Sequence, residues 1–193
     1  MPMKKIKVGL NGFGRIGRAF TRIALSRNNF EIVAINTRKT PTSIMAYLLA
    51  FDSVYRRFGM EVKEESDGIS VNGKKILTLL NDQPENIPWD KYGVDVVVDA
   101  TGAFNKKPDL EKHLKGSVKK VILTAPAKDE ETPFVVLGVN DKTFDFKKET
   151  VISNASCTTN AATPVMSVMG ANPGIEKAIL NTIHAYTASQ GLV

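Results

Sequence analysis

The feature that most constrains the fold is a glycine-rich turn between an apolar strand and a helix. Residues 4–10 form an apolar strand pattern that runs directly into NGFGRIGR, which begins at Asn11, and a helical pattern follows. In this context Gly12 permits the tight turn, Gly14 lets the backbone approach a pyrophosphate, and Gly17 lets helix and strand pack closely. Residues 30–36 supply a second strand at the right distance. The pattern predicts a dinucleotide at the helix N-terminus, and a purely structural turn is the alternative.

The residues after the second strand bear on which dinucleotide is bound. Dinucleotide-binding folds usually place an Asp or Glu there, which binds the ribose hydroxyls and repels a 2′-phosphate. This chain instead reads Thr37-Arg38-Lys39, without a carboxylate. Thr37 can donate a hydrogen bond, and Arg38 or Lys39 can offset a phosphate charge, so the cofactor is NAD or NADP and the three residues favour NADP use. The alternative is that Arg38 and Lys39 are solvated turn residues before Pro41.

Strand and helix patterns alternate through the rest of the first 153 residues. We expect a helix within 41–55, a hairpin over 69–80, strands at 94–100, 118–124 and 134–137, and a helix at 110–114. The fold class is therefore α/β, with a doubly wound, mostly parallel Rossmann sheet over residues 1–153. Thr101 and Gly102 follow a buried strand, where a bound dinucleotide would pass. His113 is expected on the surface of its helix.

A second organising feature is SNASCTTN, residues 153–160, which contains the only cysteine of the chain. A short strand ends here and a helical pattern runs on to Gly170, so Ser156 is the predicted N-cap and Cys157 lies in the first turn. Unpaired amides and the helix dipole favour a thiolate at that position. We predict that Cys157 is a nucleophile with His184, in a strand-like run over 178–187, as its base. An inert cysteine is the alternative.

Composition excludes several classes of function. The net charge is +6, but most of the basic excess lies in residues 1–40, and aromatic residues do not interleave with it. Nucleic acid is therefore not an expected partner. No apolar run is long enough to span a membrane, one cysteine cannot form an intrachain disulfide, and no metal site is expected. A soluble, reducing, cytoplasmic setting fits best.

The chain resembles the phosphorylating glyceraldehyde-3-phosphate dehydrogenases along essentially its full length. The SNASCTTN segment, followed at this distance by the histidine segment, is the most specific part of the match. The matching segments are NGFGRIGR from Asn11, FDSVYRRF from Phe51, DATGAF from Asp99, LTAPAKDE from Leu123, VLGVN from Val136, SNASCTTN from Ser153 and IHAYTASQ from Ile183.

The resemblance implies a reaction. Cys157 would attack the aldehyde of glyceraldehyde 3-phosphate, with His184 as base and as donor to the developing oxyanion. Hydride would pass to NAD(P), and inorganic phosphate would release the thioester as 1,3-bisphosphoglycerate. The resemblance also implies a homotetramer and the following contacts: Ser156 and Thr158 with the attacking phosphate, Thr187 with the substrate phosphate, and Gly12, Arg15, Ile16, Thr101, Gly102 and Thr124 with the cofactor.

The chain departs from the family pattern in three ways. Thr37 replaces the acidic residue, an arginine replaces a glycine in the segment around Tyr55 and Arg56, and the family continues beyond the position of Val193. Residues 154–193 are thus expected to be the incomplete start of an α+β catalytic domain. We expect this fragment alone to bind dinucleotide weakly and to catalyse poorly or not at all. A dinucleotide-binding fragment without turnover and an erythrose-4-phosphate dehydrogenase remain the alternatives.

Overall fold

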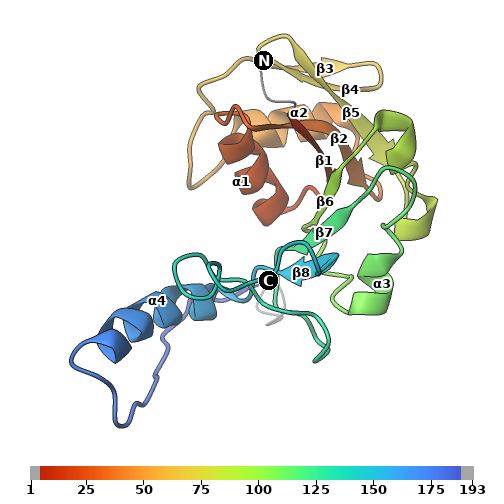
Figure 1. The fold of residues 1–193 in the computed structure, drawn as a ribbon. Helices are drawn as coiled ribbons and strands as arrows, with labels where there is room; N and C mark the ends of the chain where they lie inside the picture. Colours follow the sequence, from red (N-terminus) through yellow and green to blue (C-terminus); the bar gives the residue numbers. More distant parts are fainter. Residues whose placement is uncertain (1–4, 188–193) are drawn as a thin grey trace.

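The computed structural model describes residues 5–187, which form one twisted sheet with helices on both faces (Figure 1). The sheet has eight strands in the order β3-β4-β5-β2-β1-β6-β7-β8. The elements are β1 (Ile6–Asn11), α1 (Arg15–Ala24), β2 (Phe30–Thr37), α2 (Thr42–Ala50), β3 (Val62–Glu65), β4 (Gly68–Val71), β5 (Lys74–Leu80), the 3-10 helices η1 (Pro84–Asn86) and η2 (Trp89–Tyr92), β6 (Val96–Asp99), α3 (Lys107–Glu111), β7 (Lys120–Leu123), β8 (Val151–Ser153) and α4 (Cys157–Ala171).

Strand β1 lies at the centre of the sheet, paired in parallel with β2 on one side and with β6 on the other. The chain first builds outward through β2 and then returns to build outward through β6, β7 and β8, all in parallel. This reversal makes the sheet doubly wound, and it opens a crevice beyond the carboxyl ends of β1 and β6. The predicted α/β class and Rossmann sheet are confirmed.

Two apolar cores cover the two faces of the sheet. One contains Leu10 of β1, Ile35 of β2, and Met45 and Leu49 of α2. The other contains Trp89, Val97, Leu110 and Val121, which bring η2 and α3 against β6 and β7. Because both faces are covered, the central strands are apolar without alternation, as the sequence pattern of β6 predicted.

Two predicted strands are wrong. Within 134–137 only Phe134 makes an isolated bridge, to Ser153. The amide of Val136 donates to Asn140 Oδ1 at 2.8 Å, and that of Gly138 to Asp141 Oδ1 at 2.7 Å. These local side-chain acceptors turn the chain away from the sheet. Residues 178–187 are not a strand either, because no strand of the described part of the chain lies beside them.

The C-terminal part of the described chain leaves the sheet. Helix α4 begins after β8 and projects away from the other elements (Figure 1), and none of its residues is buried. Ile179 and Ile183 are 99% and 98% exposed, so this run presents apolar surface although it is not a strand. Among residues 5–187, no helix is both long and apolar enough to cross a bilayer.

The arginine that replaces a glycine has a local structural consequence. Arg56 adopts a left-handed conformation with φ of 61°. Its carbonyl oxygen accepts two hydrogen bonds from the guanidinium of Arg22, at 3.1 and 3.2 Å, which fixes the backbone there. A Cβ in this conformation lies close to the carbonyl oxygen and costs free energy that glycine avoids.

We therefore expect Arg56→Gly to raise the free energy of unfolding by about 1 kcal/mol. Chemical denaturation of the purified protein measures it. Arg56→Ala is the matched control, since it removes the side chain and keeps the Cβ, and it should leave the stability close to that of the original chain. A destabilised Arg56→Gly variant would contradict the backbone explanation.

Candidate functional site

A cleft of about 760 Å³ opens at the carboxyl ends of the central strands. Residues after β1, β2 and β6 all reach it, since parallel strands end at the same edge of the sheet. Its walls include Asn11, Gly12, Phe13, Gly14, Arg18, Asn36, Thr37, Arg38, Lys39, Leu48, Asn81, Asp82, Gln83, Ala100, Thr101 and Phe104. The cleft thus occupies the switch point of the sheet, where doubly wound folds bind their ligands.

The glycine-rich turn is shaped as the sequence motif requires. Gly12 has φ of 97°, and a Cβ there would lie 2.7 Å from the carbonyl carbon of Ala100. A Cβ at Gly17 would overlap the carbonyl oxygen of Gly12, whereas the space around Gly14 is open. Helix α1 begins just after Gly14, which carries no capping side chain. The first amides of a helix have no intrahelical acceptors, and Gly14 at the start of α1 lines the cleft, so the residues present fit the pyrophosphate of a dinucleotide.

The end of the cleft beside β2 carries opposite charges. Thr37 is 5% exposed, and its hydroxyl lies 3.4 Å from the carbonyl oxygen of Thr40. Arg38 Nε contacts Asp82 Oδ1 at 3.2 Å, with both side chains well exposed. The sequence predicted the basic group here, but not the carboxylate, which comes from the segment after β5.

The predicted cofactor residues fall into two groups. Gly12, Gly14, Thr37, Arg38 and Thr101 line the cleft, whereas Arg15, Ile16, Gly17, Gly102 and Thr124 do not belong to its walls. Arg18, Asn36, Asn81 and Asp82 also line it, and the sequence analysis missed them. Arg18 was detectable, because it lies within the glycine motif and one helical turn from Gly14.

Cys157 and His184 come together at the start of α4. The distance between Cys157 Sγ and His184 Nε2 is 3.1 Å, and both residues are exposed. His184 Nδ1 lies 2.6 Å from the carbonyl oxygen of Ala185, which only accepts, so Nδ1 carries the hydrogen. This leaves the basic lone pair of Nε2 facing the thiol. The cysteine follows β8 by four residues and therefore lies at the same sheet edge as the cleft.

The helix start that presents Cys157 is capped as predicted. Ser156 Oγ accepts a hydrogen bond from the amide of Thr159 at 3.0 Å, and it also lies 2.9 Å from Thr158 Oγ1. Ser156 and Thr158 thus lie on either side of the cysteine, half-buried, with their hydroxyl groups in contact. Thr187 lies exposed on the segment that carries His184.

The two partners shift one another's ionisation. The hydrogen bond with His184 is the main cause that lowers the pKa of the Cys157 thiol below its usual value. The pKa of His184 is raised, first by its bond to the Ala185 carbonyl and then by its contact with Cys157. Both shifts act in the direction of a thiolate beside an imidazolium.

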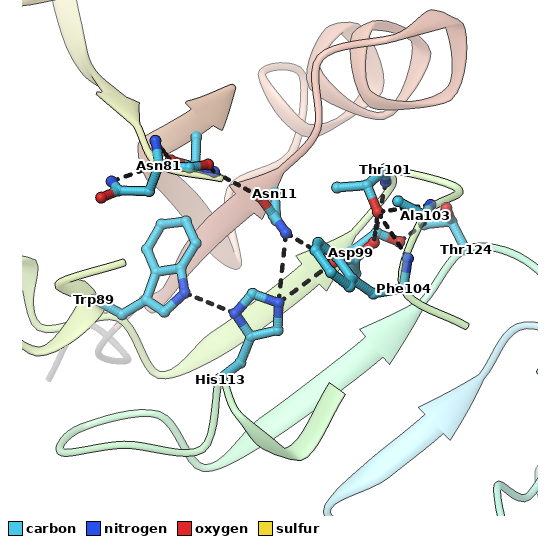
Figure 2. Close-up of polar contacts among 10 residues, drawn as sticks. Asn11, Asn81, Trp89, Asp99, Thr101, Ala103, Phe104, His113 and Thr124 are labelled. Carbon is cyan, nitrogen blue, oxygen red and sulfur yellow. Dashed lines mark hydrogen bonds and ion pairs between the residues drawn. The ribbon is translucent and has the colours of Figure 1, made fainter. Parts of the chain in front are cut away.

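One expectation about the surroundings of the cleft is wrong. His113 is fully buried rather than at the surface. Helix α3 ends at Glu111, so His113 lies in the following turn and points under β6 (Figure 2). Its Nδ1 accepts a hydrogen bond from Trp89 Nε1 at 3.0 Å, and its Nε2 lies 3.3 Å from Asp99 Oδ2. Both partners are distant in the sequence, which is why the local charge pattern failed to predict this burial.

Comparison with known families identifies the fold. Residues 6–107 match the family model described as glyceraldehyde 3-phosphate dehydrogenase, NAD binding domain. The chain belongs to this family. Residues 156–193 match the model of the C-terminal domain of the same family. The second match begins at Ser156, one residue before the cysteine. In the described part of the chain, no cluster of three or more His, Cys, Asp or Glu side chains could hold a metal ion.

Individual relatives agree with the family assignment. The chain is 46% identical over 187 residues to glyceraldehyde-3-phosphate dehydrogenase 1 of Bacillus cereus, covering 97% of this chain and 55% of the relative. It is 46% identical over 189 residues to glyceraldehyde-3-phosphate dehydrogenase of Streptomyces coelicolor, with 97% and 56% covered. For the enzyme of Ajellomyces capsulatus the identity is 43% over 188 residues, with 97% and 55% covered. The chain spans about half the length of the curated relatives it matches.

The hydrogen bond between Cys157 and His184 predicts the pH dependence of thiol reactivity. Alkylation by iodoacetamide requires the thiolate, so its rate should rise at lower pH in the original protein than in His184→Ala. Near neutral pH, loss of His184 should slow alkylation several-fold, because the thiol pKa returns toward its usual value. Stopped-flow measurement across the pH range tests this.

Asn181→Ala is the control for this measurement, because it alters an exposed residue on the same segment as His184. Its pH profile should match that of the original protein. Superimposable profiles for the original protein and His184→Ala would show that His184 does not lower the pKa of the Cys157 thiol, which would contradict the hydrogen bond between them.

Proposed function

We propose that this chain carries the nucleophile and the cofactor cleft of a glyceraldehyde-3-phosphate dehydrogenase. The reaction is the phosphorylating oxidation of an aldehyde, with glyceraldehyde 3-phosphate and inorganic phosphate as substrates. The observation that carries the proposal is the 3.1 Å contact between Cys157 Sγ and His184 Nε2. The pair lies at the carboxyl edge of a sheet whose switch point holds a cleft of about 760 Å³. The sequence resemblance and the family membership support the same proposed function.

The chemistry follows from the two side chains. Cys157 Sγ attacks the aldehyde carbon and forms a carbon–sulfur bond, while His184 Nε2 holds the thiol proton and donates to the developing oxyanion. When bound, the nicotinamide supplies the acceptor for the hydride that leaves this carbon. A phosphate oxygen then attacks the thioester, the carbon–sulfur bond breaks, and the thiolate is regenerated. The product is an acyl phosphate, 1,3-bisphosphoglycerate.

The family resemblance implies roles for other residues around the pair. Ser156 and Thr158, which lie on either side of Cys157, are proposed on that ground to hold the attacking phosphate. Thr187, three residues after His184, is proposed to hold the phosphate of the substrate. Arg15, Ile16, Gly102 and Thr124 are retained as proposed cofactor contacts. The proposal further includes a homotetramer in a cytoplasmic setting.

The proposed activity is tested on the protein produced from its complete gene. Formation of the reduced cofactor from glyceraldehyde 3-phosphate should depend on added phosphate, and Cys157→Ser should lower kcat by at least about a thousandfold, because an alcohol replaces the activated thiol. His184→Ala should also lower kcat, with dinucleotide affinity preserved. Asn181→Ala serves as the control.

Two results would contradict the proposal. Binding of dinucleotide without turnover of any aldehyde would favour a binding module. Preferred turnover of erythrose 4-phosphate would assign the substrate to the related dehydrogenase class instead.

The cofactor is proposed to be NAD or NADP, and Arg38 is proposed to bind the 2′-phosphate when NADP is present. Arg38 currently pairs with Asp82, and a 2′-phosphate would compete for the same guanidinium. The neighbouring carboxylate also repels a phosphate, so the two residues oppose one another. Cofactor choice therefore depends on the balance between Arg38 and Asp82.

We expect Arg38→Ala to weaken NADP binding by about tenfold, the cost of one charge-assisted contact, with little effect on NAD. Asp82→Asn should strengthen NADP binding and leave NAD binding nearly unchanged. Titration calorimetry with both dinucleotides measures these effects, and Lys39→Ala tests whether the adjacent charge contributes. A large preference of the original protein for NAD, unaltered by either substitution, would contradict the role of Arg38.

A further inference from the structure

Beneath the cofactor cleft, the carboxylate of Asp99 is fully buried at the end of β6. Its Oδ1 accepts from the amide and hydroxyl of Thr101 at 3.0 and 2.7 Å. Its Oδ2 accepts from Asn11 Nδ2 at 2.8 Å and lies 3.3 Å from His113 Nε2 (Figure 2). The group has no ion-pairing Lys or Arg partner among the described residues. A buried carboxylate held in this way by neutral donors needs all of them.

The histidine beside Asp99 is fixed in one tautomer. The indole nitrogen of Trp89 can only donate, so His113 Nδ1 must accept at the 3.0 Å contact between them. A histidine that accepts at Nδ1 carries its hydrogen on Nε2, which therefore donates to Asp99. The 3.5 Å approach of Asn11 Nδ2 to the same Nε2 then joins two donors and is not a hydrogen bond. Trp89 thus directs Nε2 of His113 at the carboxylate.

The hydrogen bonds on the other side of Asp99 run toward it in the same direction. Asn11 Oδ1 accepts from Asn36 Nδ2 at 2.8 Å, and Asn36 Oδ1 accepts from the amide of Asn81 at 3.0 Å. These bonds fix the orientation of both asparagine amides. They also join the ends of β1, β2 and β6, which are the three strands whose ends form the floor of the cleft.

Asp99 also shapes the cleft wall directly. Thr101 Oγ1 donates to the carboxylate and accepts from the amides of Ala103 and Phe104, at 3.1 and 3.4 Å. The backbone oxygen of Asp99 accepts from both the amide and the hydroxyl of Thr124, each at 3.0 Å. Asp99 therefore contacts two predicted cofactor residues: its carboxylate holds Thr101 in the cleft wall, and its backbone oxygen holds Thr124 outside that wall.

We propose that Asp99 is the positioning residue of the cofactor cleft, and that it presets the Thr101 loop and the Asn11–Asn36 floor before the dinucleotide binds. The proposal rests on the proposed dinucleotide function of this cleft and adds a residue that does not itself line it. A preset wall avoids the entropy cost of ordering the loop during binding. Asparagine cannot replace Asp99, because its NH₂ group would face donors on whichever side it turned.

The test compares Asp99→Asn with Asp95→Asn on the protein from its complete gene. Asp95 precedes the other end of β6 and pairs with Lys119 at 2.7 Å, so the control makes the same chemical change away from the cleft. Asp99→Asn should weaken NAD binding by about tenfold or more, as loss of a buried charged hydrogen-bond acceptor implies. Asp95→Asn should change NAD binding by less than about twofold, because Asp95 lies at the opposite end of β6 from the cleft.

A second measurement separates positioning from loss of stability. Thr101→Val removes the group through which Asp99 acts, so Asp99→Asn in that background should add much less than in the original chain. Independent, multiplying effects on the NAD dissociation constant would overturn the proposal. Thermal unfolding of each variant identifies any variant that fails to fold. If Asp99→Asn fails, Thr101→Val alone decides, and unchanged NAD affinity in that variant overturns the proposal.

The network also has a readout that needs no cofactor. Trp89 is the only tryptophan of the chain, and its indole bonds to His113, so its fluorescence emission reports the state of the network. Asp99→Asn should change this emission and Asp95→Asn should not. Unchanged emission would contradict the connection through His113. Failure of the original protein to bind any dinucleotide would instead refute the proposed cofactor function, which makes the two failures distinguishable.

Discussion

Parallel pairing of β1 with both β2 and β6 is the constraint on which the rest of this structure depends. It brings residues 11, 37 and 101, far apart in the sequence, to one edge of the sheet. It also buries β1 and β6 on both faces, which explains their apolar composition and the two separate cores. The cleft is a consequence of this topology, because the chain must leave the sheet in opposite directions at the point where the winding reverses.

The same edge receives Cys157 and His184. Strand β8 is parallel to β7, so the chain leaves it on the cleft side and begins α4 at Cys157. The cap at Ser156 fixes the first turn, and His184 supplies both a hydrogen bond and a favourable charge to the thiol. Local helix chemistry and global sheet topology therefore act together to place the Cys157 thiol at the same sheet edge as the cleft.

The sequence predicted those features that arise from local chemistry. The glycine turn, the hairpin over β4 and β5, the cap at Ser156 and the helix after Cys157 all follow from short-range rules, and each is confirmed. Features that depend on distant partners were missed. The burial of His113 requires Trp89 and Asp99, and the pairing of Arg38 requires Asp82. The strand expected at 134–137 does not form, because backbone amides there donate hydrogen bonds to the side chains of Asn140 and Asp141. Hydrophobic periodicity does not reveal such local bonds.

In the proposed reaction, Cys157 carries the substrate acyl group. The most direct test is to mix the protein with glyceraldehyde 3-phosphate and oxidised cofactor without phosphate, quench in acid, and examine the peptides by mass spectrometry. The account predicts an acylated Cys157 peptide that disappears when phosphate is added and never forms in Cys157→Ser. Turnover with an unmodified Cys157, or an acyl group on another residue, would contradict it.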